Sequence, residues 1–97
     1  MLIKSWEEFI KLLEDNQNLF KYTIKKFWLD KEKGFYEDYI EIFYNGVTLL
    51  INDEFKEVSV VEKNGYQVIN EMIIATKCTY DRYMQIIEAI FDINVEI

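Results

Sequence analysis

The first part of the chain has the hydrophobic spacing of an amphipathic helix. Four apolar side chains recur at positions i, i+3, i+4 and i+7, namely Trp6, Phe9, Ile10 and Leu13. Ser5, followed three residues later by Glu8, predicts a capping box at the start of this helix. The polar run over residues 15–18 predicts its end, because asparagine tolerates the left-handed conformation there. We expect the four apolar residues to be buried against a predicted sheet, through Ile40, Ile42 and Leu49.

Residues 20–52 alternate with the period of two that is typical of strands. Asn45-Gly46 is the sequence of a type I′ hairpin turn, and a two-residue loop there pairs Ile42 with Leu49. The side chains of this pair then lie on the same face of the sheet.

A polar loop over residues 30–34 predicts the hairpin that comes before it. Pairing Leu29 with Phe35 across this loop sets Ile24 opposite Ile40. The two turns therefore put the apolar residues of three strands on one face, so that each turn supports the other.

A second hairpin is predicted further along the chain. The β-branched run 58–61 and Asn64-Gly65 indicate a strand and a turn, with a further strand over residues 66–75. Its register stays open, because two pairings face opposite sides of the sheet: Val60 with Ile69, and Val61 with Val68.

The C-terminal part of the chain again has a helical pattern. Thr79 or Asp81 can cap a helix whose apolar side chains recur at helical spacing, at Tyr83, Ile86, Ile87 and Ile90. Residues 93–97 alternate with a period of two and are compatible with a sixth strand at the edge of the sheet.

Strands clustered between two helices predict an α+β fold rather than an α/β fold. We expect a largely antiparallel sheet of five strands, or six if the tail adds one, with an N-terminal and a C-terminal helix packed on one face. Residues 1–97 are expected to form a single α+β domain, because 97 residues with 51% hydrophobic content suffice for one core.

The composition argues against several kinds of chemistry. The chain has no histidine, one cysteine and three separate glycines, so it lacks the usual acid–base group, zinc-binding cysteine pairs and phosphate-binding loops. We therefore expect no enzymatic activity, no metal and no cofactor. Cys78 follows an apolar run and is expected to be a small buried residue.

The charge balance points to a protein partner. A net charge of −7 disfavours nucleic acid and anionic membranes, because phosphate groups repel an acidic surface. The chain has no apolar run as long as a membrane span and no leader pattern at its start, so we expect a cytoplasmic protein. An acidic surface suits a basic host or cognate protein.

The main functional hypothesis is therefore a small inhibitor that blocks a basic, nucleic-acid-handling protein. No motif names a family, but size, charge and composition resemble those of phage or mobile-element anti-defence proteins, such as anti-CRISPR proteins, and of toxin-immunity proteins. Candidate contact residues are acidic or aromatic and fall into two segments of the chain: Glu37, Tyr39, Glu41 and Phe43, then Asp53, Glu54, Glu57 and Glu62.

The alternative hypothesis is a structural or regulatory homo-oligomer. A second copy would bind through the sheet face that carries Tyr39, Phe43 and Leu50, because aromatic residues are enriched at interfaces. It could instead bind through the C-terminal edge strand, whose backbone groups would be free to pair.

Overall fold

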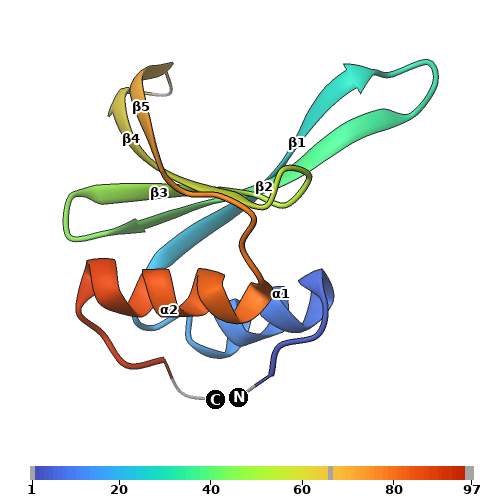
Figure 1. The fold of residues 1–97 in the computed structure, drawn as a ribbon. Coiled ribbons are helices and arrows are strands. Elements are labelled where there is room, and N and C mark those ends of the chain that lie inside the picture. Colours follow the sequence, from blue (N-terminus) through green and yellow to red (C-terminus); the bar gives the residue numbers. More distant parts are fainter. Residues whose placement is uncertain (1, 66, 96–97) are drawn as a thin grey trace.

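The computed structural model describes residues 2–65 and 67–95, and the side chains of all of these except 25–29, 36 and 37. Within this part of the chain, five antiparallel strands form one sheet in the order β1-β2-β3-β4-β5, between an N-terminal and a C-terminal helix. The elements in chain order are α1 (Trp6–Asp15), β1 (Lys21–Asp30), β2 (Phe35–Tyr44), β3 (Val47–Asn52), β4 (Glu57–Asn64), β5 (Gln67–Ala75) and α2 (Tyr80–Phe91). Both helices lie on the same face of the sheet (Figure 1), so the expected α+β architecture is confirmed.

The start of α1 has the predicted capping geometry with one variation. The Ser5 side chain accepts a hydrogen bond from the Glu8 backbone N–H at 3.1 Å. The Glu8 carboxylate accepts in return from the N–H of Lys4, at 2.8 Å, rather than from that of Ser5. The helix ends where expected, but Asn16 has φ −114° and is not left-handed. Its buried side chain instead donates to the Leu12 carbonyl at 2.8 Å, which satisfies a carbonyl of the last turn.

Two of the four apolar residues of α1 are buried as expected. Phe9 and Leu13 have no exposed surface, whereas Trp6 and Ile10 are only half-buried, so the prediction is wrong for these two. The apolar face of the helix is wider than the part that contacts the sheet. Trp6 therefore stacks on Phe9, with ring centroids 5.7 Å apart, and lies at the border of the core.

The register of the first three strands is confirmed over most of its length. Ile24 pairs with Ile40, and Ile42 lies between Tyr22 on β1 and Leu49 on β3. At the far end of the β1–β2 hairpin the prediction is wrong, because Asp30, not Leu29, pairs with Phe35.

The physical reason for this shift is the turn chemistry of Asp30. Its carboxylate accepts hydrogen bonds from the N–H groups of Glu32 and Lys33, at 3.1 and 3.2 Å. The loop is therefore one residue shorter than expected, and a bulge between Trp28 and Asp30 absorbs the change.

Neither predicted pairing of the β4–β5 hairpin is present. Val60 pairs with Met72 and Val61 pairs with Glu71. The hairpin closes between Asn64 and Gln67 instead of around Asn64-Gly65, and the register shifts twice more along β5. Two bulges in one strand cannot be read from turn residues alone.

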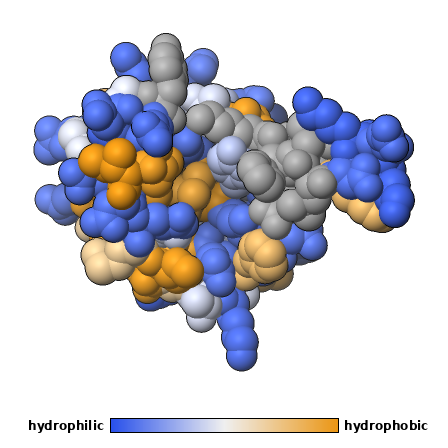
Figure 2. Space-filling view, turned by 90° about the horizontal axis from the view of Figure 1, so that it is seen from above, coloured by the Kyte–Doolittle hydropathy of each residue, from blue (hydrophilic) through white to orange (hydrophobic). Residues whose placement is uncertain are grey.

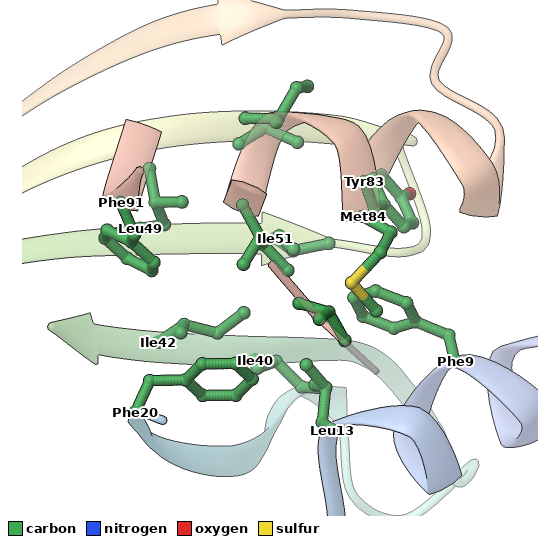
Figure 3. Close-up of a cluster of buried hydrophobic side chains, with 14 of the residues drawn as sticks. Phe9, Leu13, Phe20, Ile40, Ile42, Leu49, Ile51, Tyr83, Met84 and Phe91 are labelled. Carbon is green, nitrogen blue, oxygen red and sulfur yellow. The ribbon is translucent and has the colours of Figure 1, made fainter. Parts of the chain in front are cut away.

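The core lies between the helices and the face of the sheet that carries Ile40, Ile42, Leu49 and Ile51 (Figure 3). Thr79 is the N-cap of α2 and accepts from the N–H of Arg82 at 3.1 Å, as one of the two predicted caps. The other, Asp81, accepts from the N–H of Ile3 at 2.7 Å and ties the N-terminal segment to α2. Cys78 is buried, as expected.

The buried face of α2 differs from the prediction at one position. Ile90 is exposed, and the residues that face the core are Tyr83, Met84, Ile86, Ile87 and Phe91.

The tail after α2 packs against the core instead of adding a strand. Val95 is buried, and its N–H donates to the Glu88 carboxylate at 3.3 Å. The expected sixth strand is therefore wrong for residues 93–95, while residues 96 and 97 lie outside the described residues.

Candidate protein-binding surfaces

The turn between β3 and β4, residues 53–56, is held to the rest of the protein by its backbone. The Asn52 side chain accepts from the N–H groups of Glu54 and Phe55, at 3.0 and 3.3 Å, as in an Asx turn. The Asp53 N–H donates to the Asp38 carbonyl on β2 at 3.0 Å. These bonds fix the path of the turn on one side.

Side chains fix the same turn to α2. The Lys56 ammonium donates to the carboxylate of Asp53 and, at 2.8 Å, to the Tyr80 hydroxyl, and it lies 4.5 Å from the centre of the Tyr80 ring. The Lys56 carbonyl accepts from the Cys78 N–H at 2.9 Å. Burial alone would lower the pKa of Lys56, but the hydrogen bonds that its ammonium donates to Asp53 and Tyr80 outweigh this effect, and the pKa is raised.

Two side chains of this turn are left facing solvent. Glu54 is exposed, and the Phe55 ring is 57% exposed, although aromatic rings of this size usually pack on something. Asp53, in contrast, has a side chain only 16% exposed and is engaged with Lys56. The turn therefore presents one carboxylate and one aromatic ring on a fixed backbone.

The other acidic candidates do not join this turn. Glu57 is half-buried at the start of β4, where it pairs with Asn52. Glu62 is exposed near the far end of β4, opposite Asn70 of β5. The structure thus brings Asp53 and Glu54 together, places Glu57 at the exit of the turn, and separates Glu62 from all three.

The second candidate segment lies on the sheet face opposite the helices, where the two outer hairpins rise and leave a hollow between them (Figures 1 and 2). A concavity of about 280 Å³ there is bordered by Phe43, which is 48% exposed, and by an ion pair between Glu41 and Lys63 at 2.7 Å. Tyr39 and Leu50 are half-buried, and the side chain of Glu37 lies outside the described residues. Glu41 therefore forms an ion pair that links β2 to β4 across β3.

Sequence reasoning missed the most hydrophobic exposed element, the edge strand β5. Its large apolar side chains are between 39% and 63% exposed, at Val68, Ile69, Met72, Ile73 and Ile74. The signal for it is the consecutive run Met72-Ile73-Ile74, which breaks alternation and puts apolar groups on both faces of a strand. Phe55 was missed as well, although an aromatic residue within an acidic link is an identifiable signal.

Among the described residues, no three metal-ligating side chains lie close enough to hold an ion, and no helix is long and apolar enough to span a membrane. Comparison with protein-family models, curated protein sequences and solved structures finds no match to this chain.

Proposed function

We propose that the chain is a non-enzymatic protein-binding protein that docks on a basic partner through the β3–β4 turn and acts as an inhibitor. One observation carries this proposal: a turn fixed to β2, to α2 and to the segment before α2 leaves Glu54 and the Phe55 ring facing solvent. A fixed turn loses little conformational entropy on binding, so that its exposed side chains retain more of their interaction energy.

The chemistry of the turn defines the partner. An aromatic ring is the type of side chain that fills a pocket at the centre of an interface. A carboxylate beside it favours a cationic surface, and the net charge of −7 steers the whole protein toward such a surface. A basic groove that binds nucleic acid meets both requirements, and an acidic protein seated in it would compete with phosphate.

The test starts by identifying the partner and then measures its affinity. A photo-crosslinking amino acid in place of Phe55, in the cells that make the protein, is expected to capture a basic nucleic-acid-binding protein. The same amino acid in place of Ile90, which is 44% exposed on α2, is the matched control and is expected to capture none.

Variants of the turn then separate the contributions of Phe55 and Glu54 to partner binding. Phe55→Ala is expected to weaken the purified complex by about 30-fold, the effect of losing an interface hot spot of about 2 kcal/mol. Glu54→Lys is expected to slow association and to reduce the salt dependence of the affinity. Asp53 is left unchanged, because its substitution would release the turn itself. A complex that is indifferent to Phe55→Ala and to salt would contradict the proposal.

A further inference from the structure

Strand β5 is an edge strand with an unusual surface. It is the last strand of the sheet order, and Figure 1 shows it at the border of the sheet. Met72 lies on the side of its β4 partner Val60, and Ile73 lies on the other side with Ser59. Both residues are more than half exposed, so that the strand is apolar and solvent-exposed on both faces.

Edge strands of this kind are normally protected. Proteins blunt them with proline, charge or bulges, because an open hydrophobic edge pairs with other chains. The chain has no proline, and Glu71 is the one charged residue among the nine of β5. The two register shifts distort only the ends of the strand, and residues 70–73 pair regularly with β4. A regular edge of four residues, with one charged side chain and with Met72 and Ile73 exposed on its two faces, therefore remains open.

We propose that this edge pairs with β5 of a second copy of the chain, antiparallel and about a two-fold axis, to give a continuous sheet across the dimer. The proposal concerns a different surface from the β3–β4 turn and does not depend on it. A strand that is apolar on both faces is matched by a neighbour that is also apolar on both faces, and β5 of a second copy is such a neighbour.

The available area is consistent with a dimer of moderate affinity. Five side chains that are about half exposed present roughly 500 Å² of apolar surface, against about 600–1,000 Å² per partner in stable interfaces, and the strand backbone adds the remainder. Both copies carry a net charge of −7, and their repulsion opposes association. We therefore expect the dimer to become tighter as salt is raised.

Symmetry limits the register. In an antiparallel pair of identical strands about a two-fold axis, the residue at the axis lies opposite its own copy. Glu71 at the centre would place two carboxylates side by side, which is unfavourable. Met72 is also within the regular segment and is the most exposed apolar residue of β5, at 63%. We place the axis at Met72, so that the most exposed apolar side chains of the two copies meet, and Ile73 then lies beside Glu71 of the second copy.

Sedimentation velocity over about 1 to 200 µM protein tests the oligomeric state. The wild-type protein is expected to be dimeric at the upper end, and Met72→Lys is expected to weaken the dimer at least tenfold, because two ammonium groups would meet at the centre. Ile90→Lys replaces another exposed apolar residue, on α2, and is expected to leave the dimer unchanged. Circular dichroism checks that both variants fold.

Cysteine crosslinking tests the register. Residues directly opposite in an antiparallel pair have Cα atoms about 4.5–5.5 Å apart, within the range of a disulfide. Met72→Cys is expected to form a covalent dimer under mild oxidation, whereas Lys77→Cys, exposed beyond the end of β5, is not. A wild-type protein that stays monomeric at 200 µM, a dimer that persists in Met72→Lys, or equal crosslinking of both cysteine variants would overturn the proposal. A basic partner captured through Phe55 would be unaffected by any of these results.

Discussion

Strands β3 and β5 are both rich in large apolar residues, yet one is a centre of the core and the other is exposed. On β3, Leu49 and Ile51 are completely buried beneath the helices, and Leu50 between them is half-buried on the opposite face. On β5, Met72, Ile73 and Ile74 follow one another, and all are exposed. The difference shows that position in the sheet decides burial, because β3 lies at the centre of the sheet beneath the helices, whereas β5 lies at its edge.

The largest difference in stability is expected when isoleucine is replaced by alanine in each of the two strands. Ile51→Ala removes three carbons from a fully buried site and is expected to lower the free energy of unfolding by about 2–5 kcal/mol. Ile73→Ala makes the same change where the side chain is exposed and is expected to cost less than about 1 kcal/mol, because only strand propensity is lost.

The measurement is urea unfolding at low protein concentration, where association through β5 does not add to the apparent stability. A loss for Ile73→Ala that equals the loss for Ile51→Ala would mean that β5 is part of the core of the monomer. The comparison between the two strands would then fail.

The sequence predicts the strands that meet in the core better than those at the far edge. The first three strands are joined by two turns with clear signals, and both turns independently direct the same apolar face, with Ile40 and Ile42, toward the core. No such agreement exists for β4 and β5. Their register depends on two bulges, and an apolar strand without alternation gives no indication of which face is covered.

The sequence predicts where the candidate site lies along the chain, but not which of its side chains face solvent. The acidic link between β3 and β4 is visible in the sequence, whereas the contact that decides the role of Asp53 is not. Lys56 binds both Asp53 and Tyr80, and Tyr80 lies 24 residues away on α2. A contact of this kind arises from tertiary packing, so that local patterns cannot show which of two neighbouring carboxylates is free to bind a partner.

An intermediate effect is expected from the ion pair that ties the β4–β5 hairpin to the centre of the sheet. Lys63 on β4 reaches across β3 to Glu41 on β2, and both side chains are less than one-fifth exposed. Lys63→Met leaves the Glu41 carboxylate partly buried without this cation, and is expected to lower the free energy of unfolding by about 1–3 kcal/mol.

A double-mutant cycle with Glu41→Gln measures the coupling of the pair by urea unfolding. The double variant is expected to be more stable than the sum of the single losses predicts, by about 1 kcal/mol, because the carboxylate that lost Lys63 has been removed as well. Additive losses would show that the ion pair does not help to hold the β4–β5 hairpin in place.

The smallest effect at neutral pH is expected within the buried region itself. Tyr83 packs on the covered face of the sheet, and its hydroxyl is fully buried with no hydrogen-bond partner among the described residues. Burial, followed by the charge of Asp53, raises the pKa of this hydroxyl above its ordinary value of 10.0. Tyr83→Phe is therefore expected to change the free energy of unfolding by less than about 1 kcal/mol at pH 7, or to stabilise the protein.

The pH dependence of the free energy of unfolding tests the state of the same hydroxyl. Because the pKa is raised in the folded state, the unfolded chain loses this proton first, and stability that is present at neutral pH falls as the pH rises above about 10, by about 1.4 kcal/mol per pH unit. Burial also raises the pKa of the Cys78 thiol from 9.0, so that its contribution to this loss begins earlier. Tyr83→Phe is expected to reduce the loss above pH 10, to which Tyr22 and Lys56 also contribute because their pKa values are raised. It is expected to leave the part that begins near pH 9, which Cys78→Ala should remove. Unfolding of Tyr83→Phe at pH 7 with a loss of more than 1 kcal/mol would instead show that the hydroxyl donates a hydrogen bond to Asp53, which would make Tyr83 part of the network that holds the β3–β4 turn.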